Sequence, residues 1–161
     1  MNLIPPSGKT TGNYWCTWRT QSTVLANEEL RRSSVNLRNR IDDEFLFGNP
    51  GTLAKYFDRI REDLYVVLDD GWDVPYDANP NNSENIFGSL EVNEAKFPSL
   101  HGDPPERLRQ LCERVKALGY RGLGLWIACQ MPKDNEKLPT ALDKNRFITK
   151  IGVNKQTEVT K

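Results

Sequence analysis

Three short apolar runs along the chain predict three β-strands. They occupy residues 13–18 (NYWCTW), 64–68 (LYVVL) and 122–128 (GLGLWIA), and the second is rich in β-branched residues. Apolar runs of this length, bounded by turn-forming residues, are typical of strands rather than helices. The second run stops abruptly at two adjacent aspartates, Asp69 and Asp70, which makes its end the strongest candidate for a functional site.

Two segments with helical spacing separate these strands. The first is predicted over residues 51–61, because Pro50 suits the first helical position and apolar residues follow at helical spacing: Leu53, Tyr56, Phe57 and Ile60. The second begins after Asp103, a capping residue with Glu106 three positions later, and Gly119 is placed to end it. Its apolar face consists of Leu108, Leu111, Cys112, Val115 and Leu118. Alternating strands and helices joined by short loops predict an α/β fold with parallel strands.

Three segments lie outside this repeat. Residues 20–48 are polar and are predicted to be loop-like, with room for one short helix. Residues 73–102 form a long connection, which we expect to wall a pocket because it leaves the strand end that carries the aspartate pair. Residues 132–161 are polar and lysine-rich, and are expected to be mostly irregular, with at most one short strand over 146–153.

Composition narrows the class of partner. The chain has 22 basic and 22 acidic residues, so it lacks the positive field that binds nucleic acid or anionic membranes. No window approaches the roughly 18 apolar residues of a membrane span, and no secretory signal is recognisable. We therefore expect a soluble, cytoplasmic protein with a small or neutral partner. The three cysteines have no metal-binding spacing, so reduced thiols, no metal site and no cofactor are expected: Cys16, Cys112 and Cys129.

Adjacent aspartates at a strand end have three uses: accepting hydrogen bonds from substrate hydroxyls, ligating a divalent cation, or capping the following turn. Gly71 supplies the turn that lets both Asp69 and Asp70 meet one ligand. Hard cations gather several oxygen ligands at regular offsets, and no third acidic residue follows at a matching spacing. A magnesium-dependent phosphoryl-transfer enzyme is therefore the weaker alternative.

Tryptophans favour a sugar as the ligand. They recur at the ends of all three predicted strands: Trp15 and Trp18, Trp72, and Trp126. The apolar face of a sugar packs well on an aromatic ring, while carboxylates accept charge-assisted hydrogen bonds from its hydroxyls. Core packing explains each tryptophan better when it is taken singly, but their coincidence at three strand ends favours the sugar interpretation.

A set of motifs resembles the amino-terminal half of an α-galactosidase-type glycoside hydrolase. The run LDDGWDV is preceded by GNYWCTW and followed by FGSLEVNEAKFPS and LGYRGLGLWIA. The resemblance covers roughly residues 3–131. It implies a partial (β/α)₈ TIM barrel of about the first three strands and two helices. Residues 1–131 are then the amino-terminal portion of the catalytic domain, and residues 132–161 are a divergent tail.

The resemblance also implies roles for individual residues. In that family, the paired aspartates of the second strand bind hydroxyls of the terminal galactosyl unit, and they match Asp69 and Asp70. Trp18 and Trp126 are the nearest matches to the aromatic residues of the sugar pocket. The partner implied is an α-galactoside or a related sugar.

One departure from the family concerns catalysis. The family's nucleophile belongs to a Lys-x-Asp motif on the fourth strand and its acid/base aspartate to the sixth, and neither Asp134 nor Asp143 fits that motif. We therefore expect no catalytic residue in this chain, as in a truncated or frameshifted reading frame, since a barrel needs about 200–250 residues. The alternative is a catalytically inactive carbohydrate-binding or interaction module. Open sheet edges would favour self-association in either case.

Overall fold

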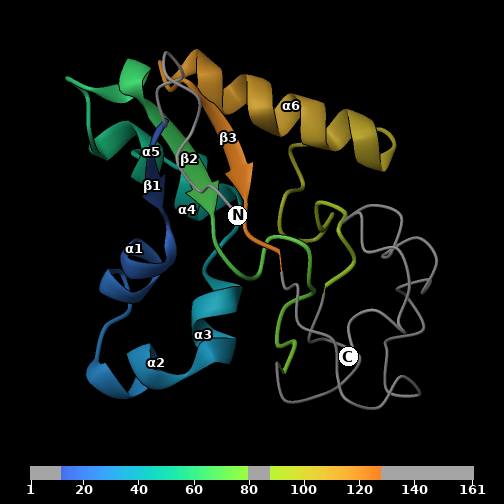
Figure 1. Cartoon of the computed structure of the whole chain (residues 1–161). Coiled ribbons are helices and arrows are strands. Elements are labelled where there is room, and N and C mark those ends of the chain that lie inside the picture. Colours follow the sequence, from blue (N-terminus) through green and yellow to red (C-terminus); the bar gives the residue numbers. More distant parts are fainter. Residues whose placement is uncertain (1–11, 80–87, 128–161) are drawn as a thin grey trace, which may run out of the picture.

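A three-stranded parallel sheet organises the protein, as seen in a computed structural model that describes residues 12–79 and 88–127 (Figure 1). The strands are β1 (Asn13–Cys16), β2 (Leu64–Leu68) and β3 (Gly122–Leu125), and β2 lies in the centre. Val66 is in register with Trp15 on β1 and with Leu123 on β3. The predicted strands and their parallel order are confirmed, although β1 and β3 end two and three residues earlier than expected.

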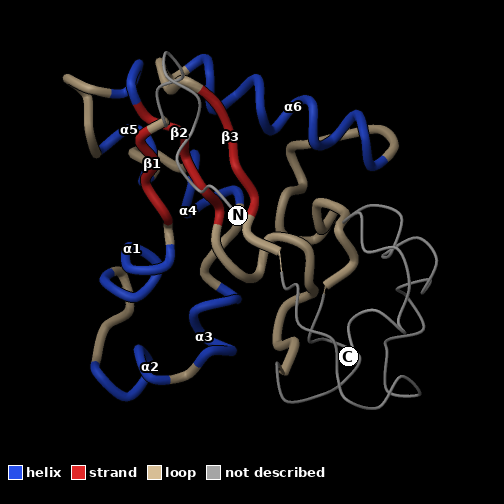
Figure 2. Tube along the Cα trace, in the orientation of Figure 1, coloured by secondary structure: helices blue, strands red, loops and turns tan. Residues whose placement is uncertain are grey.

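Short helices fill the connection between β1 and β2 (Figure 2). In the part of the chain that the structure describes they are α1 (Trp18–Thr23), α2 (Glu28–Arg32), α3 (Ser34–Asn39), α4 (Asp43–Phe47), α5 (Thr52–Lys55) and the 3₁₀ turn η1 (Arg61–Asp63). The prediction of a loop over 20–48 was therefore wrong. Side-chain caps explain the difference, because Asn27, Ser33 and Asp42 each accept a hydrogen bond from the backbone N–H three residues later.

The predicted helix over 51–61 is mostly absent. It is confined to α5, in which Leu53 is buried. Three of its four predicted apolar residues are exposed: Tyr56, Phe57 and Ile60. The backbone turns extended at Tyr56 and adopts a positive φ of 59° at Phe57, so the helical path is broken there. Both rings instead pack edge-to-face with the Trp15 ring on β1.

The predicted helix after Asp103 is confirmed as α6 (Pro104–Ala117). The Asp103 carboxylate accepts a hydrogen bond from the backbone N–H of Glu106 (2.9 Å), and Gly119 follows the helix with φ of 94°. Leu111 and Val115 are fully buried, whereas Leu108 lies at the edge of the apolar face. None of the helices in the described ranges is long and apolar enough to cross a membrane.

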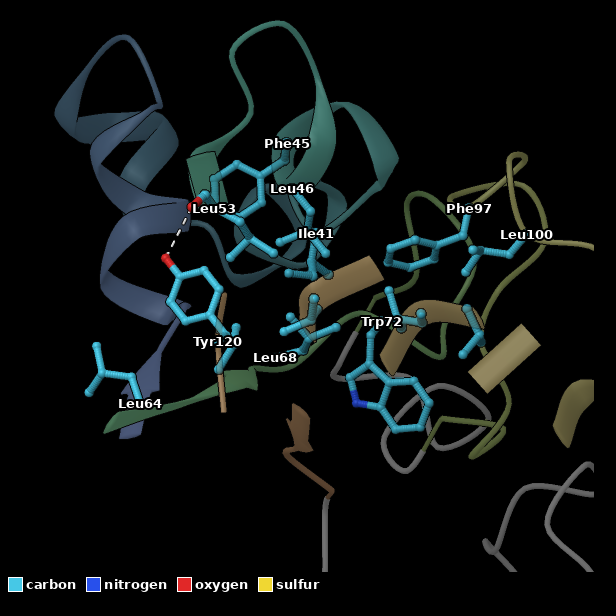
Figure 3. Close-up of a cluster of buried hydrophobic side chains, with 14 residues drawn as sticks. Ile41, Phe45, Leu46, Leu53, Leu64, Leu68, Trp72, Phe97, Leu100 and Tyr120 are labelled. Carbon is cyan, nitrogen blue, oxygen red and sulfur yellow. Dashed lines mark hydrogen bonds between the residues drawn. The ribbon is translucent and has the colours of Figure 1, made fainter. Parts of the chain in front are cut away.

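One face of the sheet carries the core (Figure 3). Leu64, Val66 and Leu68 point from β2 into a cluster with buried residues of α5, α6 and the segment around α4: Ile41, Phe45, Leu46, Leu53, Leu111 and Val115. The opposite face carries Tyr14, which is 68% exposed, and Tyr65. Parallel sheets are normally covered on both faces.

The described residues therefore form a mixed α/β structure in which no closed barrel is seen. The outer strands β1 and β3 each pair on one side only within the described ranges. The expected self-association through these edges stays a prediction. The tail at 132–161 lies outside the described residues.

Candidate functional site

The ends of the three strands meet at the carboxyl edge of the sheet. Asp69 and Asp70 follow β2 directly, and the backbone N–H of Asp69 donates to the hydroxyl of Thr17, just after β1 (3.0 Å). The backbone N–H of Trp126, just after β3, donates to the carbonyl of Leu68 (2.8 Å). The structure thus brings the predicted aspartates and Trp126 to one edge, where parallel sheets bind ligands.

Asp69 is held by its own turn and by β1. Its Oδ1 accepts a hydrogen bond from the backbone N–H of Asp70 (2.8 Å), and its Oδ2 accepts one from Sγ of Cys16 (2.7 Å). Burial and the contact with Asp69 raise the pKa of the Cys16 thiol, so the sulfur keeps the proton that it donates. Turn capping, one of the three uses considered for the pair, is therefore part of what Asp69 does.

Asp70 forms an ion pair that the sequence did not reveal. Nε of Arg38, a residue of α3, donates to Oδ1 of Asp70 at 2.8 Å, and the two side chains are 2% and 19% exposed. Burial raises the pKa of Asp70 above its ordinary value, while the Arg38 guanidinium acts against this rise. Among the described residues, no hydrogen bond to Oδ2 of Asp70 is seen.

Lys96 supports the turn beneath the pair. Its buried Nζ donates to the carbonyls of Arg38 (2.9 Å) and Gly71 (2.8 Å). Burial, and then the charge of Arg38, lower the pKa of Lys96 to about 8. Glycine is required at position 71, because φ is 117° and a Cβ would lie 2.4 Å from the Arg38 carbonyl oxygen. Arg38 and Lys96 thus fix the turn that presents the aspartates.

The tryptophans noted at the ends of the three predicted strands divide into core and surface residues. Trp72 is only 2% exposed, packs in the core and donates from Nε1 to the carbonyl of Trp126 (2.8 Å). Trp15 packs on the helix-covered face, next to Tyr120. Trp18 is half-buried and begins α1 instead of ending a strand. Trp126 is 42% exposed and is available to a ligand.

The described part of the long connection lines several hollows. One of about 350 Å³ is bordered by Glu94, Pro98, Leu100, His101, Gly102 and Arg107. A smaller one of about 190 Å³ lies between residues 90–92 and the start of α6. Neither of these two hollows is lined by Asp69 or Asp70. The expectation that this connection walls the pocket of the pair stays a prediction, since residues 80–87 of the connection lie outside the described residues.

No metal centre is seen among the described residues, where no three His, Cys, Asp or Glu side chains cluster suitably. Cys16 and Cys112 are free thiols, and Cys129 lies outside the described ranges. No protein-family model, curated protein or solved structure matches this chain.

Asp73 gives the fold a distinctive pH dependence. Its buried Oδ2 accepts a hydrogen bond from the backbone N–H of Leu90 (3.0 Å), and burial raises its pKa from 3.8 to about 6. The folded chain then binds this proton more tightly than the unfolded chain. The stabilisation that comes from this proton is fully present below pH 3.8 and is lost as the pH rises through 6. Between these values the free energy of unfolding falls with a slope approaching about 1.4 kcal/mol per pH unit.

The variant Asp73→Asn is expected to lose this slope, because asparagine keeps an acceptor for Leu90 but does not titrate. Urea unfolding at pH 4.5, 5.5 and 6.5 measures the difference in free energy of unfolding between the variant and the wild type. The exposed Asp58→Asn is the matched control and should keep the wild-type slope. If the free energies of unfolding of Asp73→Asn and the wild type change with pH in parallel, Asp73 has an ordinary pKa.

Proposed function

We propose that the described residues form the sugar-binding part of an α-galactosidase-type glycoside hydrolase. Asp69 and Asp70 accept hydrogen bonds from hydroxyls of a terminal galactosyl unit, and the exposed ring of Trp126 packs on its apolar face. The observation that carries the proposal is the adjacent carboxylate pair at the carboxyl edge of a parallel sheet, with no hydrogen bond to Oδ2 of Asp70 seen among the described residues. In this proposal, β1 to β3 are the first strands of a (β/α)₈ barrel.

Binding without cleavage is the activity that we assign to this chain. Retaining hydrolysis needs a nucleophile and an acid/base carboxyl about 5 to 5.5 Å apart. The Lys-x-Asp motif of the family nucleophile is not found in residues 132–161. The chain therefore acts as a carbohydrate-binding module that holds a galactoside and leaves its glycosidic bond intact.

Titration with methyl α-galactoside, followed by tryptophan fluorescence, tests this proposal. We expect a saturable change from Trp126, and a loss of affinity of about tenfold or more in Asp69→Asn, because hydrogen bonds to charged groups contribute about 1.5–3 kcal/mol. Asparagine at position 69 still accepts the hydrogen bond from the Asp70 backbone, so the turn is preserved. Asp58→Asn removes the same charge from an exposed loop and should bind like the wild type.

Two outcomes would count against the proposal. No fluorescence change at high millimolar sugar, or equal affinity in both variants, would remove the aspartate pair as the binding site. Release of nitrophenol from nitrophenyl α-galactoside that disappears in Asp69→Asn would instead show that the chain cleaves its ligand.

A further inference from the structure

Arg38 and Lys96 are the two charged residues that are almost fully buried in the described part of the chain. Arg38 is only 1% exposed, although it belongs to α3, a six-residue helix in a polar segment of the chain. Nε donates to Asp70, and Nη1 donates to the carbonyl of Ala78 at 3.4 Å. Burying a guanidinium is costly unless it is paired and hydrogen-bonded, so such a residue requires a structural or functional explanation.

We infer that Arg38 is the positioning residue of the sugar site: it holds Oδ1 of Asp70 and thereby turns Oδ2 toward the ligand. This inference rests on the proposed function. An N–H donor at one carboxylate oxygen fixes the rotation of the carboxylate plane, and a ligand hydroxyl gains from an acceptor that is already oriented. Arg38 touches Asp70 and is assigned no contact with the sugar.

Lys96 has a different part in the same arrangement. Its Nζ binds two backbone carbonyls, those of Arg38 and Gly71, so it joins α3 to the turn without contacting a carboxylate in any described hydrogen bond. Two segments thus place cations around Asp70: α3 supplies Arg38 and the long connection supplies Lys96. The carboxylates of Asp69 and Asp73 are the negative charges nearby.

The positioning role predicts a coupled change in two measurements on Arg38→Gln. The first is the pH at which the Asp70 carboxyl titrates, observed by ¹³C NMR of the folded chain. The second is the pH at which methyl α-galactoside binding is half lost. Both should move upward together by about one pH unit or more, because an opposite charge at this distance lowers a carboxyl pKa by about 1–3. An ion pair without a role in sugar binding would move the Asp70 midpoint alone and leave the midpoint of sugar binding unmoved.

Two further variants keep the test decisive. Arg38→Lys retains the charge but not the planar donor, so it should keep both midpoints near the wild type while binding the sugar more weakly. It also replaces Arg38→Gln if the latter does not fold. Arg32→Gln removes an arginine from an exposed pair with Glu28 and should change neither measurement.

The outcomes separate this inference from the proposed function. An unmoved Asp70 titration in folded Arg38→Gln, or full sugar affinity in Arg38→Lys, overturns the positioning role even if the wild type binds galactoside. A wild-type chain that binds no galactoside overturns the proposed function and the ligand role of Arg38 together. If the Asp70 titration nevertheless shifts in Arg38→Gln, Arg38 and Asp70 form an ion pair that has no part in sugar binding.

Discussion

Replacing Leu111 with alanine is expected to lower the free energy of unfolding by about 2–5 kcal/mol, because the substitution leaves a cavity in the core. Leu111 is fully buried on α6 and packs in the cluster that joins this helix to the sheet. A loss of this size is a large fraction of the about 5–15 kcal/mol that stabilises a typical domain. Urea unfolding followed by circular dichroism measures it.

The same helix offers a matched control for this prediction. Leu108 lies three residues away and is 36% exposed, so Leu108→Ala should cost less than about 1 kcal/mol while making the same chemical change. Equal losses in the two variants would mean that α6 does not present the face seen in the structure.

Replacing Trp72 with alanine is expected to lower the free energy of unfolding by about 3–5 kcal/mol, since it removes the largest side chain that is buried among the described residues. The change also leaves the Trp126 carbonyl without the hydrogen bond from the indole Nε1. Trp126→Ala should leave the free energy of unfolding nearly unchanged, because this ring is 42% exposed. Thermal or urea unfolding of the two variants gives the comparison.

Sugar binding should depend on Trp126 more than on Trp72, the reverse of their effects on stability. Trp126→Ala is expected to weaken methyl α-galactoside binding and to remove its fluorescence response, whereas the conservative Trp72→Phe should keep binding. A destabilised Trp126→Ala with normal sugar affinity would place Trp126 in the core and contradict its assignment to the site.

The elements with strong local signals could be predicted from the sequence. β2 is a continuous β-branched run that ends at a glycine turn, and α6 begins at an Asp cap followed by proline. Such signals act within a few residues and do not depend on distant packing. The parallel direction of the strands followed from the alternation of strands and helices along the chain.

The short helices α2 to α4 could not be recognised from apolar spacing, because five or six residues are too few to show a period. Their caps, Asn27, Ser33 and Asp42, were the available signal. The helix predicted over 51–61 failed for the opposite reason. Its apolar spacing was regular, but Tyr56 and Phe57 pack on the ring of Trp15 from an irregular backbone.

The candidate site was predicted only in part. Asp69 and Asp70 were identified because they interrupt a buried strand, and Trp126 because it follows one. Arg38 was missed, and Lys96 was noted only within the motif FGSLEVNEAKFPS, because charged residues are almost never fully buried. Their burial depends on a pairing with residues that lie 25 to 58 positions away.

A ¹⁵N NMR titration of the chain with methyl α-galactoside tests the sugar site most directly. We expect the perturbed amides to cluster at the strand ends, around Cys16, Asp69, Asp70 and Trp126. Perturbations centred instead on the hollow beside Glu94 and Arg107, or none at saturating sugar, would contradict the assignment of the aspartate edge as a sugar-binding site.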